Sequence, residues 1–217
     1  MKKPNILFII MDDQRADTLR GFPGNRPHTP NQDKLVDTGT SFRNTFITTP
    51  ICTPARAEVL TGCHTFHNEV PWFGMPINPD LTLMPGHFQE HGYHTIHSGK
   101  WHNDGHPKSK GNVRTRCVMN QDNLLDHREY GHTMRFREEN GTEVQGHSTE
   151  LFTNAAIEEI QQAPEGSPWF CYLAFHSPHD PFDCPPPFDQ FHQPESVPLP
   201  ENYMPEAPAD NGDLTIR

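Results

Sequence analysis

The sequence lacks several features that would assign it to a large class of proteins. Only 33% of its residues are hydrophobic, and it contains no apolar run long enough to span a membrane. Its five cysteines are odd in number and include no Cys-x-x-Cys pair, which argues against a disulfide framework. Its formal net charge is -11, which argues against a general nucleic-acid binder. An anionic ligand would therefore need a local positive site.

The N-terminus does not have the pattern of a secretory signal peptide. Lys2 and Lys3 are basic, but the apolar run that follows is short and ends at Asp12 and Asp13. We expect either a cytoplasmic protein or the mature part of an exported one, and the sequence leaves this choice open.

Strand and helix patterns alternate along the chain. Continuous apolar runs predict buried strands at residues 6–10 and 168–175, and residues 93–97, which follow a helix stop at Gly92, are also expected to form a strand. Start and stop signals predict helices at residues 30–38, 53–60, 82–91 and 148–162, with Thr82 and Ser148 as caps. This alternation predicts an α/β fold with a mostly parallel sheet flanked by helices. We expect one domain with a loop-rich insertion at about 103–146, which includes a possible hairpin, and a Pro-rich irregular tail at about 181–217.

One pentapeptide combines a nucleophile with a positive charge. Cys52-Thr53-Pro54-Ala55-Arg56 places a Cys and an Arg on the same side of a helix that begins here. Pro54 suits the first turn of a helix. Cys52 would then lie where free amides and the helix dipole favour an anion, and the guanidinium of Arg56 suits a tetrahedral oxyanion. Taken alone, the pattern is equally compatible with a small buried Cys at an ordinary helix start.

Polar residues follow each of the predicted strands. Asp12 and Asp13 follow the first, Lys100 and His102 lie after the second, and His179 follows the third. Ligands of parallel α/β sheets bind beyond the carboxyl ends of the strands, so these residues should converge. Adjacent carboxylates repel unless a cation neutralises them, and hard oxygen ligands suit Ca²⁺ or Mg²⁺. A solvated acidic turn is the alternative at Asp12 and Asp13.

Four segments resemble, in order, those of the formylglycine-dependent sulfatases, which are arylsulfatase-like members of the alkaline phosphatase superfamily. The four segments are Pro4–Asp13, Cys52–Arg56, Gly92–His102 and Tyr172–His179. The resemblance covers most of the chain and implies that Cys52 is oxidised to the aldehyde formylglycine after synthesis. Either an aerobic formylglycine-generating enzyme or an anaerobic radical enzyme would carry out this maturation.

The resemblance also implies a reaction and a metal. A hydrated aldehyde at residue 52 would cleave a sulfate ester of a carbohydrate or an aryl alcohol in two covalent steps. Asp12, Asp13 and the modified Cys52 would bind the metal ion, which is usually calcium in this family.

Four further residues would act on the sulfate group. By resemblance, Arg56 and Lys100 would hold sulfate oxygens, and His102 would contact the hydrate. His179 would contact the sulfate near the leaving group, where it could donate a proton. We expect Lys100 and His102 to point to the same side of an extended segment, since they are two residues apart.

The matched segments belong to the N-terminal part of a sulfatase. Complete members carry a later Asp-Asn metal pair and a later sulfate-binding Lys, which we do not find here. We therefore expect that activity needs a missing C-terminal half. Two alternatives remain: a phosphonate monoester or phosphodiester hydrolase of the same superfamily, and a non-catalytic fragment that binds an anion or a partner chain.

Overall fold

The computed structural model describes residues 2–19, 27–120, 124–126, 133–138, 141–193, 195, 197, 199 and 201–205. The chain divides into two units. The first combines Met1–Arg15 with Phe42–Pro185, and the second combines Ala16–Ser41 with Pro186–Arg217. Every residue predicted to take part in the site belongs to the first unit.

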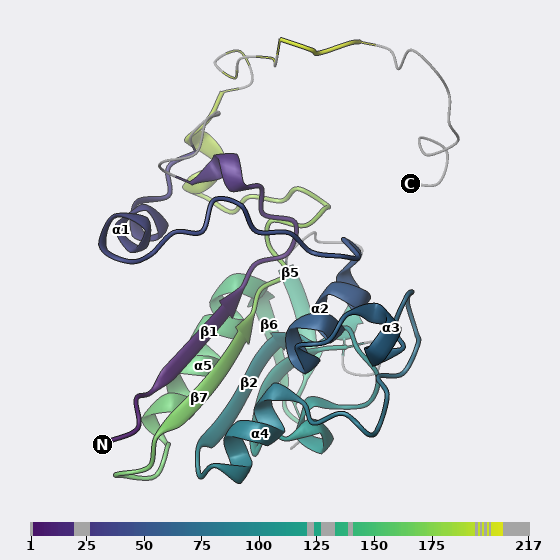
Figure 1. Cartoon of the computed structure of the whole chain (residues 1–217). Helices are drawn as coiled ribbons and strands as arrows, with labels where there is room; N and C mark the ends of the chain where they lie inside the picture. Colours follow the sequence, from purple (N-terminus) through teal and green to yellow (C-terminus); the bar gives the residue numbers. More distant parts are fainter. Residues whose placement is uncertain are drawn as a thin grey trace. The chain divides into compact units, whose positions relative to one another are not determined.

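A four-stranded sheet forms the centre of the first unit (Figure 1). Its strands are, in spatial order, β1 (Ile6–Ile10), β7 (Trp169–Ala174), β2 (His94–Lys100) and β3 (Arg114–Met119). All three neighbouring pairs are parallel, as the alternation of strands and helices predicted. β3 lies in the segment from 103 to 146, where the sequence indicated loops. It begins with the polar run Arg114-Thr115-Arg116, which concealed the strand.

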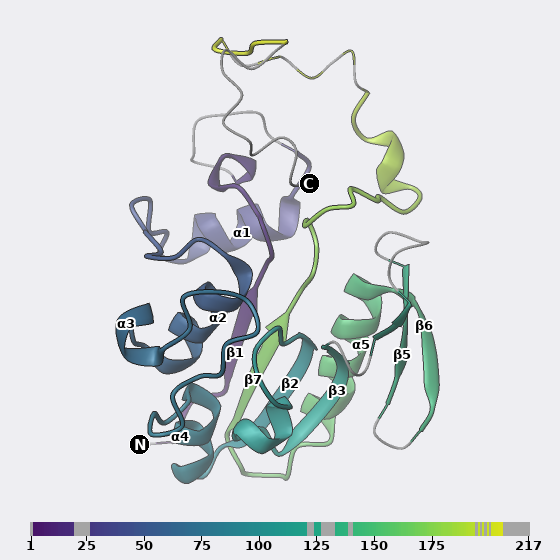
Figure 2. The same ribbon diagram turned by 90° about the vertical axis from the view of Figure 1, so that its right-hand side faces the viewer.

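Helices cover both faces of this sheet (Figure 2). α2 (Cys52–Thr61) and α4 (Met84–Glu90) lie on one face, and α5 (Ser148–Gln161) lies on the other. Both faces of β7 are buried, which explains why its sequence is continuously apolar. Phe170, Tyr172 and Ala174 pack in the core on the α2 and α4 face, whereas Cys171 and Leu173 pack with α5. Phe152, Ala155 and Ala156 of α5 are buried and form the apolar face of this helix.

The segment from 103 to 146 also contributes a second, antiparallel sheet. This sheet contains β4 (Leu124–Asp126), β5 (Thr133–Arg137) and β6 (Glu143–His147). Met134 and Phe136 of β5 pack into the core beneath α5, so the sheet is part of the first unit. The remaining short helices of this unit are α3 (Thr65–Asn68) and the 3₁₀ turn η2 (Pro107–Lys110).

The helix ends show where local signals were right and wrong. In the second unit, α1 (Pro30–Thr38) begins after Thr29 and is followed by Gly39, as predicted. The other described elements of this unit are the 3₁₀ turns η1 (Ala16–Thr18) and η3 (Phe188–Gln190). The two predicted caps were wrong, because Leu83 and His147 occupy the cap positions of α4 and α5 and neither helix has a side-chain cap bond.

Other expectations concern irregular segments. Residues 41–47 form no strand. Residues 206–217 of the Pro-rich tail lie outside the described residues. Among the residues that the structure describes, no helix has the length and apolarity needed to cross a membrane.

Candidate active site

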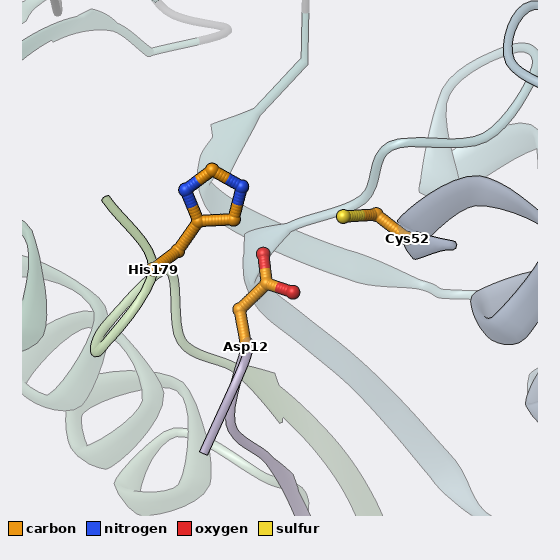
Figure 3. A group of neighbouring side chains, drawn as sticks. All are labelled: Asp12, Cys52 and His179. Carbon is orange, nitrogen blue, oxygen red and sulfur yellow. The ribbon is translucent and has the colours of Figure 1, made fainter. Parts of the chain in front are cut away.

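The predicted residues converge at the carboxyl ends of the parallel strands. Asp12 follows β1, Lys100 ends β2, His179 follows β7, and Cys52 begins α2. Figure 3 shows the side chains of Asp12, Cys52 and His179 pointing toward one another. Their ligand atoms all lie within 4.8 Å of one another. The structure thus brings together residues that are far apart in the sequence.

Asp12 is buried among three basic side chains, and we call Asp12, Arg56, Lys100 and His176 the site cluster. Oδ2 of Asp12 accepts a hydrogen bond from Nζ of Lys100. The same oxygen lies 3.6 Å from Nη2 of Arg56 and 3.8 Å from Nδ1 of His176. Burial alone would raise the pKa of Asp12, but the neighbouring ring of His176 and the charges of Lys100 and Arg56 hold this pKa well below its ordinary value. Asp12 is therefore a carboxylate at neutral pH.

Arg56 lies one helical turn after Cys52, as the spacing predicted, but it does not extend freely into solvent. Its side chain is buried, and Nη1 donates a 3.0 Å hydrogen bond to the carbonyl oxygen of Lys100. Its guanidinium also lies near the hydroxyl of Tyr172 on β7, where its charge opposes the rise in the pKa of Tyr172 that burial causes. Arg56 therefore joins the start of α2 to the ends of β2 and β7, and it supplies positive charge from beneath the site.

Gly99 allows β2 to deliver Lys100 to this position. Its φ of +98° is in the region that favours glycine, and a Cβ atom there would lie 2.0 Å from the carbonyl oxygen of Ala174. The pairing register with β3 also shifts between Ser98 and Lys100. Any residue larger than glycine at position 99 would push β2 away from β7 just before Lys100.

Cys52 is the first residue of α2, and Ile51 before it is extended. The structure therefore confirms the predicted helix start. Burial raises the pKa of the thiol, the charge of Lys100 opposes this shift, and Asp12 and Asp13 add to it. The net direction is upward, so Cys52 is protonated at neutral pH. An unmodified thiol in this position is a poor nucleophile.

His102 lies beside the cluster in an unusual backbone conformation. Its φ of +54° is left-handed, so the prediction that Lys100 and His102 share an extended segment was wrong. Burial, together with the positive charges of Lys100 and Arg56, lowers the pKa of His102 to about 4. Its ring is therefore neutral at neutral pH. Nδ1 of this ring is buried and has no hydrogen-bond partner among the described residues.

His179 is partly exposed and faces acidic neighbours. Its Nε2 lies 4.0 Å from Oδ2 of Asp13, and its Nδ1 lies 2.6 Å from the carbonyl oxygen of Asp180. His176, to which the sequence assigned no role, stacks on His179 with 4.6 Å between ring centroids and lies 3.4 Å from Nζ of Lys100. The one sequence signal for His176 was its place directly after a buried strand.

The donor set fits part of the shell of a hard cation. Asp12 supplies a buried carboxylate and Asp13 an exposed one, and residue 52 lies within reach of Asp12. Ca²⁺ and Mg²⁺ both prefer oxygen ligands, and Ca²⁺ takes six to eight. The thiol of Cys52 is a soft ligand, whereas an oxygen at the same position would match the two carboxylates. The structure brings together only part of the predicted ligand set, because the ligand atoms of Asp13 lie with those of His179 and Asp180 and not within 4.8 Å of both Asp12 and Cys52.

Comparison with known proteins agrees with this geometry. A family model described as Sulfatase matches residues 4–203. The sulfatase YidJ of Escherichia coli K12, itself uncharacterised, is 31% identical over 202 residues, which are 85% of this chain and 40% of that protein. The chain spans less than half the length of the curated relatives that it matches.

Two solved structures illustrate the similarity of fold. The structure of BT4656 in complex with its substrate D-glucosamine-2-N,6-O-disulfate has a TM-score of 0.70 and 27% identity, over 82% of this chain and 35% of that chain. A phosphonate monoester hydrolase of Silicibacter pomeroyi has a TM-score of 0.72 and 22% identity, over 91% of this chain and 46% of that chain. The second likeness concerns the fold alone.

Proposed function

This chain belongs to the sulfatase family, and we propose that it supplies the nucleophile and the anion-binding floor for hydrolysis of sulfate esters of carbohydrates or aryl alcohols. The observation that carries this proposal is the meeting of Cys52, Asp12 and His179 above the buried cations Lys100 and Arg56. A sulfate ester needs a nucleophile, a positive field for its oxygens and a proton for the leaving alcohol. Residue 52 would supply the nucleophile, Lys100 and Arg56 the positive field, and His179 the proton.

The proposal assigns Cys52 as the precursor of formylglycine. A hydrated aldehyde there supplies one hydroxyl that attacks sulfur as the alcohol leaves, and a second whose deprotonation expels sulfate and restores the aldehyde. The raised pKa of the unmodified thiol supports this assignment, because a protonated buried thiol would attack poorly. Maturation would require a formylglycine-generating enzyme or a radical enzyme as a partner.

The other residues hold charge and move protons. Lys100 and Arg56 place positive charge beneath the sulfate oxygens, where charge increases in the transition state. His179, which is partly exposed, donates a proton to the leaving oxygen. His102 contacts the nucleophile as a neutral ring, consistent with its lowered pKa. Asp12 and Asp13 would hold Ca²⁺, or Mg²⁺, which would lower the pKa of an oxygen bound to it.

We further propose that full activity needs residues beyond these 217. Asp12, Asp13 and residue 52 would supply only some of the six to eight oxygens that Ca²⁺ takes, and the relative YidJ is more than twice as long as this chain. The test compares hydrolysis of matched aryl sulfate and aryl phosphonate esters by this chain and by the chain joined to the C-terminal half of a relative. Faster sulfate cleavage by the joined protein supports both proposals. Full sulfatase activity of the 217-residue chain contradicts the second, and a preference for phosphonate contradicts the first.

A further inference from the structure

Two aromatic side chains are exposed directly beside the site. Trp72 is 58% exposed and Phe73 is 45% exposed, and their ring centroids lie 5.5 Å apart at an angle of 77°. The ring of Phe73 also lies 5.6 Å from the ring of His102. We call Trp72 and Phe73 the aromatic pair. Large exposed rings next to a polar site are typical of a ligand surface.

The loop that carries the aromatic pair is anchored at both ends. The amide of Asn78 donates to the carbonyl oxygen of Asn68, at 3.0 Å, so the base of the loop is closed. Val70 and Ile77 are buried in the core on either side of the tip. The amide of Ile77 also donates a 2.9 Å hydrogen bond to Asp104. Such a loop presents its rings at little further cost in conformational entropy.

Exposure alone does not single out this pair. Phe42, Phe46 and Phe66 are exposed to a greater extent. Within the described ranges, however, none of these three has a ring contact with a site residue, whereas Phe73 contacts His102. The aromatic pair is thus continuous with the site, and a ligand held at Cys52 could extend onto it.

We propose that the aromatic pair is a subsite that packs against the pyranose ring of a sulfated sugar, and this rests on the proposed function. A pyranose has an apolar face of C–H groups and a polar rim of hydroxyls. The apolar face gains contact with an aromatic surface while the hydroxyls remain in water. The sulfate group would then lie over the site cluster, and the aromatic pair would favour a sugar over a bare anion.

Binding to the purified 217-residue chain tests this inference. Isothermal titration calorimetry measures the affinities of inorganic sulfate and of glucosamine 6-sulfate for the wild type, Trp72→Ala, Phe73→Ala and the control Phe66→Ala. We expect the wild type to bind the sugar more tightly than sulfate. Trp72→Ala and Phe73→Ala should each weaken sugar binding by about three- to tenfold and leave sulfate binding unchanged. Phe66→Ala should change neither affinity.

The outcomes separate this inference from the proposed function. If sulfate binds but Trp72→Ala leaves the affinity for the sugar unchanged, the subsite is contradicted and the anion site stands. If neither the 217-residue chain nor the chain joined to the C-terminal half of a relative binds either probe, the proposed anion site is contradicted, and the subsite with it. Sedimentation velocity identifies the main alternative: if the wild type dimerises and Trp72→Ala is a monomer with unchanged sugar affinity, the pair is a subunit contact. Acrylamide quenching adds a direct readout, because bound sugar should shield exposed Trp72 but not buried Trp101.

Discussion

The site cluster and a second group of charged residues in the same unit are built from similar side chains but differ in their balance of charge. The second group, the α5 ion cluster, joins β3 and the end of β5 to α5 and contains Arg114, Arg116, Glu138, Glu158 and Glu159. Arg114 binds Glu159 through two hydrogen bonds of 2.6 and 3.1 Å. The two arginines of the α5 ion cluster face three carboxylates, whereas in the site cluster a lysine and an arginine face the single carboxylate of Asp12.

This difference indicates what distinguishes a functional group of charges from a structural one. The α5 ion cluster neutralises its cations internally, so it offers no positive field to a ligand. The site cluster keeps an excess of positive charge under a helix start and a partly buried Cys52. Substitutions in the two clusters should therefore affect different properties, activity in one case and stability in the other.

The largest expected effect is on turnover. Compared with the matured wild type, Cys52→Ala should hydrolyse sulfate esters about 10³-fold more slowly or worse, because the substitution removes the precursor of the nucleophile. Its free energy of unfolding should stay within about 1 kcal/mol of the wild type, since a small side chain is lost at a partly buried site. Initial rates and urea unfolding measure the two quantities. Retention of most activity in this variant would contradict the role of residue 52.

Breaking the α5 ion cluster should give the opposite result. Glu159 is 1% exposed and accepts both hydrogen bonds from Arg114. Glu159→Ala should lower the free energy of unfolding by about 2 kcal/mol, because the arginines lose a buried partner. Calorimetry with inorganic sulfate should give the wild-type affinity. A large loss of sulfate affinity without a loss of stability would remove the distinction between the clusters.

A conservative substitution in each cluster sharpens the comparison. Arg56→Lys keeps the charge but loses the planar fork that reaches Asp12, Tyr172 and the carbonyl oxygen of Lys100. We expect sulfate affinity to fall by about tenfold, which corresponds to about 1.4 kcal/mol. Arg114→Lys is the matched control and should leave sulfate affinity unchanged. Equal effects of the two substitutions would show that Arg56 has no special place in the site.

The smallest effect concerns pH and a residue beneath the site. His97 is buried against Tyr172 and Trp101, and burial lowers its pKa from 6.5 to about 3. The unfolded chain therefore takes up a proton here below about pH 6.5, while the folded chain does so only near pH 3. Folding stability should fall as the pH decreases through this window, by at most about 1.4 kcal/mol per pH unit.

The variant His97→Gln should lack this contribution, so its unfolding free energy should depend less steeply on pH. Chemical unfolding at about pH 7 and about pH 5.5 measures the difference. The exposed His67→Gln variant controls for the loss of one histidine. Parallel pH dependences of the wild type and His97→Gln would contradict a neutral buried His97.

Much of the fold could be predicted because its signals are local. Apolar runs revealed β1 and β7, although only β7 is buried on both faces and Leu7 and Ile9 of β1 are exposed. Cys52 and Gly62 flank the predicted helix α2. β3 could not be recognised, because its polar residues are satisfied by partners distant in sequence, such as Glu138 and Glu159. Propensity gives no sign of such tertiary pairing.

The site was predictable to a similar extent. Sheet topology explains why Asp12, Lys100 and His179 converge, since Lys100 ends a parallel strand and the other two residues follow one. The sequence did not indicate the burial of Arg56, which requires three separate elements to meet around its guanidinium. It also did not indicate that His176 lies against Asp12 and Lys100, because that contact depends on the path of the chain after β7.

The most direct test of the central claim is the mass of the tryptic peptide that spans residues 44–56. The chain would be produced together with a formylglycine-generating enzyme and digested under denaturing conditions. Our account predicts a peptide with the mass of an aldehyde at residue 52 in place of the thiol. A peptide that carries only unmodified Cys52, in a host that matures a known sulfatase in parallel, would contradict the claim that this residue becomes the nucleophile.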